Sequence, residues 1–418
     1  MVTHRHVTSA DVVVVGGGPA GAATAWALAR NGVDVLVLDR AHFPRPKPCA
    51  EYLSPQASRI LADMGALDAV ERAGAAQLAG MVIRAPSGET FEGRFAANHG
   101  FHGFRDRGLA LRRELLDQIV LDRARAAGAR VNEGIAVTDI IRDAGGRTSG
   151  VRVRDELGMR DIAARIVVGA DGIRSVVARR LGLFRRARWP RRMAFVTHYR
   201  GVSGIRDCGE MHVAADGYCG LADVGDGLTN VALVVPQAQV REASGDATGF
   251  FEQWLRRHPL LGARFLTAER MSPVQVTGPF ATRARQAWAP GAALVGDAAD
   301  FYDPFTGEGI YAALRGGELL GPYLCQALRA TRTREADVAL EAYDRCRRHE
   351  FSGKWRVERL IGLAVASPPI MNHAARAMNR RSDLADLLVG VVGDFVPPRE
   401  VLRPGFLLQL LMPARTRP

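Results

Sequence analysis

Residues 11–21 read Asp-Val-Val-Val-Val-Gly-Gly-Gly-Pro-Ala-Gly, and this stretch decides the fold of the 418-residue chain. Four consecutive valines predict a short parallel strand that is buried on both faces. Small residues over 19–31 predict a helix, and Gly32 is placed to end it. The apolar run over 33–38 predicts a second buried strand. Together these segments predict a βαβ unit, which indicates an α/β fold.

The glycines between the first strand and the helix carry the chemistry of this unit. Gly16 permits the tight turn, Gly18 lets backbone amides approach a pyrophosphate, and Gly21 lets the helix pack on the strand. The helix N-terminus, at Pro19 and Ala20, adds amide donors and the positive end of the helix dipole. The motif therefore predicts a dinucleotide site, and a turn without a ligand is the alternative.

An acidic residue closes the second strand. Asp39 is placed to accept hydrogen bonds from the adenosine ribose, as expected for FAD or NAD and not for NADP. The choice of FAD comes from a later segment, in which Gly296 and Asp297 follow an apolar strand. Asp297 is placed to bind ribityl hydroxyls, and Gly307 and Gly309 open a helix whose amides face a flavin. A loop with a capping aspartate is the alternative.

Four ordered motifs resemble those of the para-hydroxybenzoate hydroxylase-like FAD-dependent oxidoreductase superfamily. Besides the two glycine motifs, they are Gly-Ala-Asp-Gly-Ile-Arg-Ser at 169–175 and Arg113-x3-Asp117. The stretch 40–51 and Asp-Pro-Phe-Thr-Gly-Glu-Gly-Ile at 303–310 are most similar to the geranylgeranyl reductase branch. The resemblance implies that further residues lie at the cofactor: Arg40, Ala50, Arg113, Asp171, Pro304 and Ile310. Ala50 stands where the branch usually has glycine, and the Trp-x-Trp-x-Ile-Pro motif of flavin halogenases is absent.

We expect a Rossmann-like FAD-binding domain of the para-hydroxybenzoate hydroxylase type, an inserted antiparallel-sheet substrate domain and a helical C-terminal segment. The expected boundaries are 1–85, 105–190 and 286–345 for the FAD-binding domain, 86–104 and 191–285 for the substrate domain, and 346–418 for the helical region.

Composition bounds the class of protein. The formal net charge is +12, but no nucleic-acid motif accompanies it, so we expect no nucleic-acid partner. Five scattered cysteines without metal-ligand spacing favour a reducing cytoplasm and no metal. The arginine cluster over 179–192 is interpreted as a solvated connection between domains, with a phosphate site as the alternative. The apolar, arginine-rich C-terminal segment suggests either weak contact with the inner face of the membrane or an ordinary packed cap.

Three residues are candidates for the chemistry. Cys49 either lies beside the flavin or is a small buried side chain in a proline-stiffened loop. Glu51 is either a general acid or an exposed loop carboxylate. Tyr218 either lines the substrate cavity or belongs to the core.

The expected reaction is reduction of a carbon–carbon double bond in a lipophilic substrate of isoprenoid, polyene or polyketide type. NADPH or NADH would serve as a transient electron donor, or a reductase partner would replace it. One alternative is an NAD(P)H-dependent monooxygenase acting through a C4a-hydroperoxyflavin, because one scaffold hosts both chemistries. The other is a non-catalytic flavin-binding protein. The sequence leaves the oligomeric state open.

Overall fold

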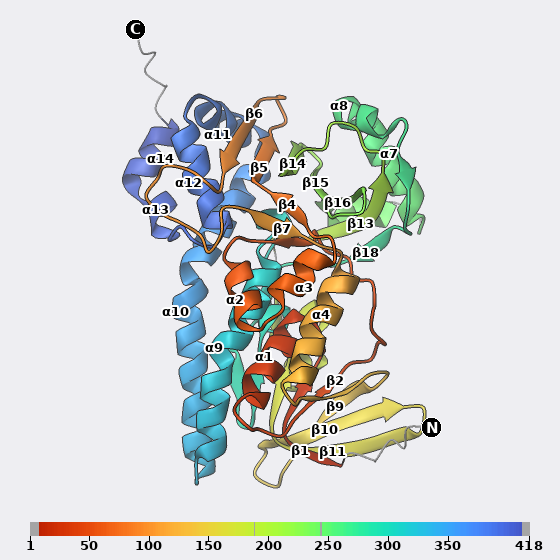
Figure 1. The fold of residues 1–418 in the computed structure, drawn as a ribbon, viewed down its shortest axis with the longest axis vertical. Coiled ribbons are helices and arrows are strands. Elements are labelled where there is room, and N and C mark those ends of the chain that lie inside the picture. The colour runs from red at the N-terminus through yellow and green to blue at the C-terminus, as the bar shows by residue number, and fades with distance from the viewer. Residues whose placement is uncertain (1–7, 188, 243–244, 412–418) are drawn as a thin grey trace.

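The computed structural model describes residues 8–187, 189–242 and 245–411 (Figure 1). The expected βαβ unit is present as β1 (Ser9–Val15), α1 (Pro19–Ala29) and β2 (Val35–Leu38). The two strands pair in parallel, and all four residues of β2 are buried. Helix α1 ends two residues earlier than the pattern predicts, and Gly32 follows it with a φ of +72°. The α/β class is confirmed.

The FAD-binding sheet grows from this unit on both sides. Its strand order is β20-β21-β11-β1-β2-β8, and β9 and β10 extend β11 as an antiparallel meander. Strand β11 is long enough to serve in both parts, pairing with β1 and with β10. The bounds of these strands are Arg130–Asn132 for β8, Ala136–Arg142 for β9, Thr148–Asp155 for β10, Gly158–Gly169 for β11, Trp288–Ala289 for β20 and Ala292–Leu294 for β21.

Helices α4 (Arg113–Ala126) and α9 (Gly309–Arg329) flank α1 (Figure 1). The contact between α1 and α9 depends on small residues. A Cβ at Gly317 would lie 2.8 Å from the Cβ of Ala23, and one at Gly321 would lie 2.8 Å from the Cβ of Ala27. Any larger side chain would therefore push these two helices apart.

The predicted second sheet is also present, and its strands pair antiparallel except β5 and β14, which pair in parallel. Its strand order is β17-β13-β16-β15-β14-β5-β6, and β18 pairs with the edge of β13. Strand β5 lies before residue 86, so the sheet begins earlier in the chain than the expected boundary, and the domain division itself stays a prediction. The bounds are Gly80–Arg84 for β5, Thr90–Arg94 for β6, Arg192–Arg200 for β13, Cys208–Ala214 for β14, Gly217–Asp223 for β15, Leu228–Pro236 for β16, Glu269–Arg270 for β17 and Gln275–Thr277 for β18.

Side chains of this sheet alternate between two apolar layers, as a strand periodicity of two requires. On one face Phe195 and Leu233 pack with Trp254 of α7 (Ala247–Arg257). On the other face Val196 and Val234 pack with residues of the C-terminal helices. The sheet therefore lies between α7 and the helical C-terminal region, as Figure 1 shows.

The chain after residue 332 is helical, as predicted. It forms α10 (Thr333–Val365), α11 (Pro368–Arg380), α12 (Ser382–Val392), α13 (Arg399–Leu402) and α14 (Pro404–Leu411). Helix α10 runs along α9 and carries the remaining helices to the end of the molecule at which the second sheet lies (Figure 1). The remaining elements are β3 (Tyr52–Leu53), α2 (Ala57–Asp63), α3 (Leu67–Arg72), β4 (Ala76–Leu78), β7 (Gly108–Ala110), α5 (Val176–Arg180), β12 (Phe184–Arg186), α6 (Gln237–Glu242), α8 (Pro259–Gly262), β19 (Thr282–Ala284), β22 (Asp300–Phe301) and single 3₁₀ turns at Gly172–Arg174, Ala263–Phe265, Gly296–Ala298 and Pro304–Thr306.

Candidate active site

The glycine turn after β1 has the geometry that its sequence predicts. Gly16 has a φ of +104°, and a Cβ there would lie 2.5 Å from the carbonyl oxygen of Ala170. A Cβ at Gly21 would lie 1.9 Å from the carbonyl oxygen of Gly16. At Gly18 the nearest neighbour is the guanidinium of Arg45, at 3.6 Å. Two glycines are thus required by close packing, while Gly18 leaves open space beside a cation at the start of α1, which fits a pyrophosphate.

Asp39 lies where the second strand ends, and it braces the glycine turn. Its Oδ2 accepts a hydrogen bond from the amide of Gly17 at 2.8 Å, and its Oδ1 accepts one from the amide of Ala41 at 2.9 Å. The Arg45 Nη2 lies 3.8 Å from Asp39 Oδ2. The neighbouring side chain, Arg40, is exposed. Asp39 is therefore fixed at the turn, in the position expected for an acid that receives a ribose.

A charged group formed by distant segments lies next to this turn. Arg113 donates to both oxygens of Asp117, at 2.7 and 2.9 Å, and both side chains are buried. Burial lowers the pKa of Lys47 and Arg113 lowers it further, while Asp297 and Asp117 oppose the shift. Burial also raises the pKa of Asp297, and Lys47 opposes this shift. Asp297, on the second glycine motif, and Arg113, on α4, are thereby brought together.

Arg45 and Lys47 belong to the stretch that resembles the reductase branch, but the sequence assigned no role to either. Arg45 Nη1 lies 3.3 Å from Asp117 Oδ2. Lys47 Nζ lies 3.6 Å from the position of a Cβ on Gly172, next to Asp171. Asp171 itself caps α5, because its Oδ2 accepts from the amide of Val176 at 2.6 Å. The cations of this loop thus stand at the turns where an anionic cofactor fits.

The segment that opens α9 provides the last part of the cofactor site. Gly307 is in the left-handed conformation, with a φ of +71°, after the turn that begins at Pro304. A Cβ on Gly307 would lie 3.0 Å from the ring of Tyr52, whose buried hydroxyl has no hydrogen-bond partner among the described residues. Gly309 begins α9, and Ile310 is buried beneath it. A buried hydroxyl without a partner beside two glycines and a helix N-terminus fits a flavin ring.

Glu51 lies at the junction between this cofactor site and the second sheet. It is 3% exposed, with a φ of +62°, so the interpretation as an exposed loop carboxylate is wrong. Its Oε1 accepts from the amide of Arg113 at 2.8 Å, and its Oε2 accepts from the side-chain amide of Asn230 at 2.9 Å. The Nε2 of His198 lies 2.8 Å from the same Oε2. These contacts tie β13 and β16 to the start of α4.

Cys49 stands beside this junction and is partly buried. Its Sγ accepts from the amide of Glu51 at 3.4 Å, and its carbonyl oxygen accepts from Asn230 at 2.9 Å. The pKa of Arg113 is raised: burial opposes the shift, while Asp117 and Cys49 cause it. Ala50 is likewise partly buried in this loop. Cys49 is thus in contact with a cation of the cofactor site, and its catalytic role stays a prediction.

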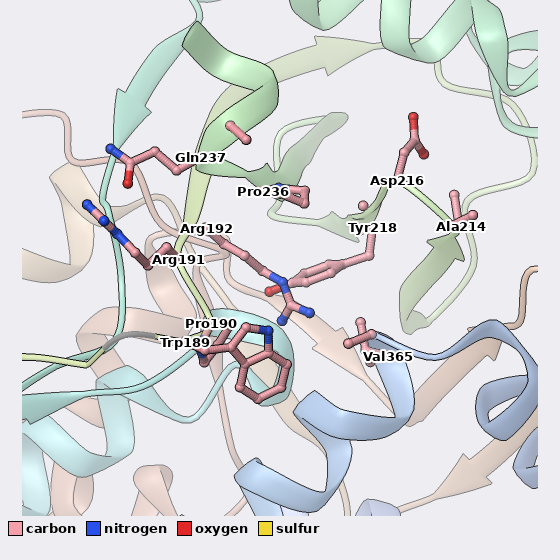
Figure 2. A pocket seen from close by; sticks show the side chains of 14 residues that line it. Trp189, Pro190, Arg191, Arg192, Ala214, Asp216, Tyr218, Pro236, Gln237 and Val365 are labelled. Carbon is pink, nitrogen blue, oxygen red and sulfur yellow. The ribbon is translucent and has the colours of Figure 1, made fainter.

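Tyr218 forms the floor of a cavity of about 390 Å³. Figure 2 shows its ring beside Arg192, with Trp189 and Val365 on other walls of the cavity. The hydroxyl of Tyr218 donates to Asp303 Oδ1 at 2.6 Å, and Arg192 Nη1 donates to Asp303 Oδ2 at 2.7 Å. Burial and Asp303 raise the pKa of Tyr218 well above its usual value. Tyr218 and Arg192, at the floor of the cavity, are therefore hydrogen-bonded directly to Asp303, the residue before Pro304.

The arginine cluster of the sequence divides into separate roles. Arg192 is buried at the cavity floor, and Arg191 lines the cavity. Arg180 pairs with Asp139 at 3.4 Å, and Arg185 is exposed. Arg188 lies outside the described residues. Five of the six described arginines of this cluster are exposed, as the solvated connection predicts, and Arg192 is the buried one. The phosphate alternative stays a prediction.

A second group of acids lies on the other side of the α9 N-terminus. The Oε1 of Glu308 lies 3.5 Å from the Nζ of Lys354, which also pairs with Asp394. Burial raises the pKa of Glu308, and Lys354 opposes the shift. Burial, followed by repulsion from Glu308, raises the pKa of Glu358 to about 8. No pattern in the sequence indicates this group, although Lys354 is one of only two lysines.

Comparison with known proteins agrees with this site. A family model described as an FAD binding domain matches residues 9–354. Digeranylgeranylglycerophospholipid reductase 2 of Methanopyrus kandleri is 32% identical over 76% of this chain and 77% of its own length. Menaquinone reductase of Mycolicibacterium smegmatis is 28% identical over 93% of this chain and 92% of its own.

Solved structures share the fold. A geranylgeranyl bacteriochlorophyll reductase-like protein from Thermoplasma acidophilum has 22% identity and a TM-score of 0.72, covering 97% of this chain and 96% of its own. The flavin-dependent brominase Bmp2 has 22% identity and a TM-score of 0.78, covering 92% and 94%. The chain belongs to the FAD-binding domain family of para-hydroxybenzoate hydroxylase-like flavoproteins and is an FAD-dependent oxidoreductase of the geranylgeranyl and menaquinone reductase branch.

Proposed function

We propose that this oxidoreductase reduces a carbon–carbon double bond in a lipophilic substrate with an isoprenoid-like chain. The observation that carries the proposal is the cavity above Tyr218, where Pro236, Val365 and Ala366 form an apolar part of the wall. An apolar wall of this kind suits a chain without polar groups. The reductase names of the relatives in sequence support the same class of substrate.

The protein's part in this reaction is to bind and orient. The Gly18 amide region and Arg45 would hold the pyrophosphate, Asp39 the adenosine ribose, and Asp297 the ribityl chain. Bound FAD supplies the transfer of hydride to the substrate. The floor of Tyr218, Asp303 and Arg192 would place the double bond beside Gly307 and Gly309. We assign proton donation to Cys49, which contacts Arg113, and not to Glu51, whose oxygens already accept from two donors and contact His198.

Electrons reach the cofactor, we propose, from NADPH or NADH bound transiently, with a reductase partner as the alternative donor. Anaerobic titration of the purified flavoprotein with each nucleotide checks this step. Bleaching of the flavin absorbance by either nucleotide supports the direct route. Bleaching by dithionite alone favours a separate partner.

The test of the reaction uses the reduced flavoprotein and a geranylgeranyl lipid under anaerobic conditions, with mass spectrometry of the product. We expect the lipid to gain one dihydrogen unit for each bond reduced. A product that instead carries ¹⁸O after exposure to ¹⁸O₂ would establish the monooxygenase alternative. Flavin that is never reoxidised by any lipid would favour a non-catalytic flavin-binding protein.

A lipophilic substrate also implies that the chain works beside a membrane, and we propose a peripheral position there. Among the described helices, none combines the length and the apolar character needed to span a bilayer. Contact would therefore be made by a surface.

A further inference from the structure

The C-terminal helices expose apolar side chains at one end of the molecule. Leu360 and Leu363 of α10 are 44% and 52% exposed, and Ile370 of α11 is 55% exposed. Leu407 and Leu408 of α14 are 39% and 52% exposed. We call these five residues the C-terminal apolar surface. Five large exposed apolar residues on three successive or packed helices are more than the isolated ones that an ordinary surface carries.

The three helices that carry this surface are held together. Helix α11 follows α10 after a two-residue turn, and α14 packs on α11. The Nε2 of His373 lies 2.8 Å from the carbonyl oxygen of Leu410, which fixes α14 against α11. His373 lies one turn after Ile370, so Ile370 is on the part of α11 that is next to α14. The surface therefore belongs to one packed helical layer.

The segments that carry this surface are mainly positive. The sequence contains no aspartate or glutamate from Arg359 to Ser382. The same stretch contains four arginines, and Arg376 and Arg380 are exposed on α11. Residues 401–411, which include α14, also lack acids, and their Arg403 pairs with Glu400. Exposed leucines beside the exposed arginines of α11 complement the anionic headgroups of a bilayer.

The surface also adjoins the cavity. Val365 and Ala366 line the cavity at the end of α10, and Ala366 lies one helical turn after Leu363. Figure 2 shows Val365 on the wall opposite Asp216 and near Tyr218. A lipid held at the C-terminal apolar surface would therefore meet the cavity at its α10 wall.

We propose that the C-terminal apolar surface docks on an anionic lipid bilayer and presents the α10 wall of the cavity to it. Leucine and isoleucine side chains enter the headgroup region, and the arginines of α11 contact the lipid phosphates. Entry of the substrate by this route rests on the proposed function, whereas docking itself does not.

The experiment is flotation of the full-length FAD-loaded protein with vesicles of phosphatidylcholine alone or of phosphatidylcholine with phosphatidylglycerol. We expect the protein to float with the anionic vesicles and to stay at the bottom with the neutral ones. The triple variant Leu363→Gln, Ile370→Gln, Leu407→Gln should lower the bound fraction by roughly tenfold or more. Arg376→Gln with Arg380→Gln should weaken binding and flatten its salt dependence.

A matched control carries the same number of exchanges at exposed apolar residues elsewhere: Leu157→Gln, Met159→Gln and Leu266→Gln. Flavin absorbance and circular dichroism verify that each variant is folded. Equal flotation of the control and the triple variant would show that the C-terminal apolar surface does not make the contact. No flotation of the wild type would refute docking on the bilayer. A dimer that the triple variant alone dissociates, without vesicle binding, would assign the surface to a second copy of the chain.

The same samples separate docking from the proposed function. Reduction of a detergent-dispersed geranylgeranyl lipid needs no vesicle, so a wild type that reduces the lipid without floating refutes docking alone. A wild type that floats and reduces no lipid refutes the proposed function alone.

Discussion

Glu51 and Glu308 are both buried acids beside the cofactor site, yet their surroundings differ. Glu51 accepts from the Arg113 amide and from the side-chain amide of Asn230, and the Nε2 of His198 lies 2.8 Å from its Oε2. Glu308 instead shares a single cation, Lys354, with Asp394, and Glu358 repels it from the next turn of α10. The contacts of Glu51 connect the start of α4 with β13 and β16, so the role of Glu51 is structural. At the second site three acids surround one lysine, so the acids bind protons more strongly in the folded protein than in the unfolded chain.

The largest effect is expected from Glu51→Leu. The change leaves the buried amide of Arg113 without an acceptor, and the side-chain amide of Asn230 keeps only its hydrogen bond to the Cys49 carbonyl oxygen. The expected cost is about 3–5 kcal/mol. Urea unfolding followed by fluorescence measures this loss, and flavin content after gel filtration should fall with it. Glu51→Gln is the matched control, because it keeps an acceptor oxygen. Equal stability of the leucine variant and the wild type would show that Glu51 does not have this structural role.

A smaller, pH-dependent loss is expected from Lys354→Met. Burial already raises the pKa of Glu308, and without the lysine the folded protein holds the protons of these acids still more strongly. An acid whose pKa is raised by folding makes the protein less stable as the pH rises above the pKa that the acid has in the unfolded chain. For a glutamate that pKa is about 4.3. The variant should thus be close to wild type at pH 5 and lose about 2–4 kcal/mol at pH 8. A loss that is the same at both pH values would show that these acids do not bind protons more strongly in the folded variant.

The smallest effect is expected from Glu358→Gln, and its sign is opposite. The pKa of Glu358 is raised to about 8, so the wild type loses stability between the unfolded value and pH 8. The glutamine variant does not lose this part, and its melting temperature should exceed the wild-type value by roughly 1–3 °C at pH 8.5. At pH 4.5 the two should melt together. Differential scanning calorimetry checks both points, with the exposed acid Glu156→Gln as the control.

The sequence predicted what adjacent residues determine. Gly16, Gly18 and Gly21 stand within six residues of one another, and a strand and a helix flank them, so turn and cofactor follow from local pattern. Asp39 and Asp297 were found in the same way, because each closes a buried strand. The antiparallel sheet followed from its alternating pattern, although the pattern did not reveal that β5 belongs to it.

The environment of Glu51 could not be predicted in this way. Its partners lie 62, 147 and 179 residues away in sequence, on α4, β13 and β16. Nothing near residue 51 shows whether such donors surround it, so an exposed carboxylate was the ordinary expectation. The pairing of Lys354 with Glu308 and Asp394 could not be predicted for the same reason. Burial of a charge is a property of the assembled layers and not of the segment that carries it.

The close contact of α1 with α9 has a consequence for synthesis of the chain. Ala23 in α1 packs on Gly317 in α9, and these residues are separated by about 290 positions, so the first helix leaves the ribosome long before its partner exists. At 5–20 residues per second, that interval is roughly 15–60 s. During this time an apolar helix is without its cover, which exposes the nascent chain to aggregation. Chaperone demand in the cell should therefore depend on the speed of translation through the middle of the gene.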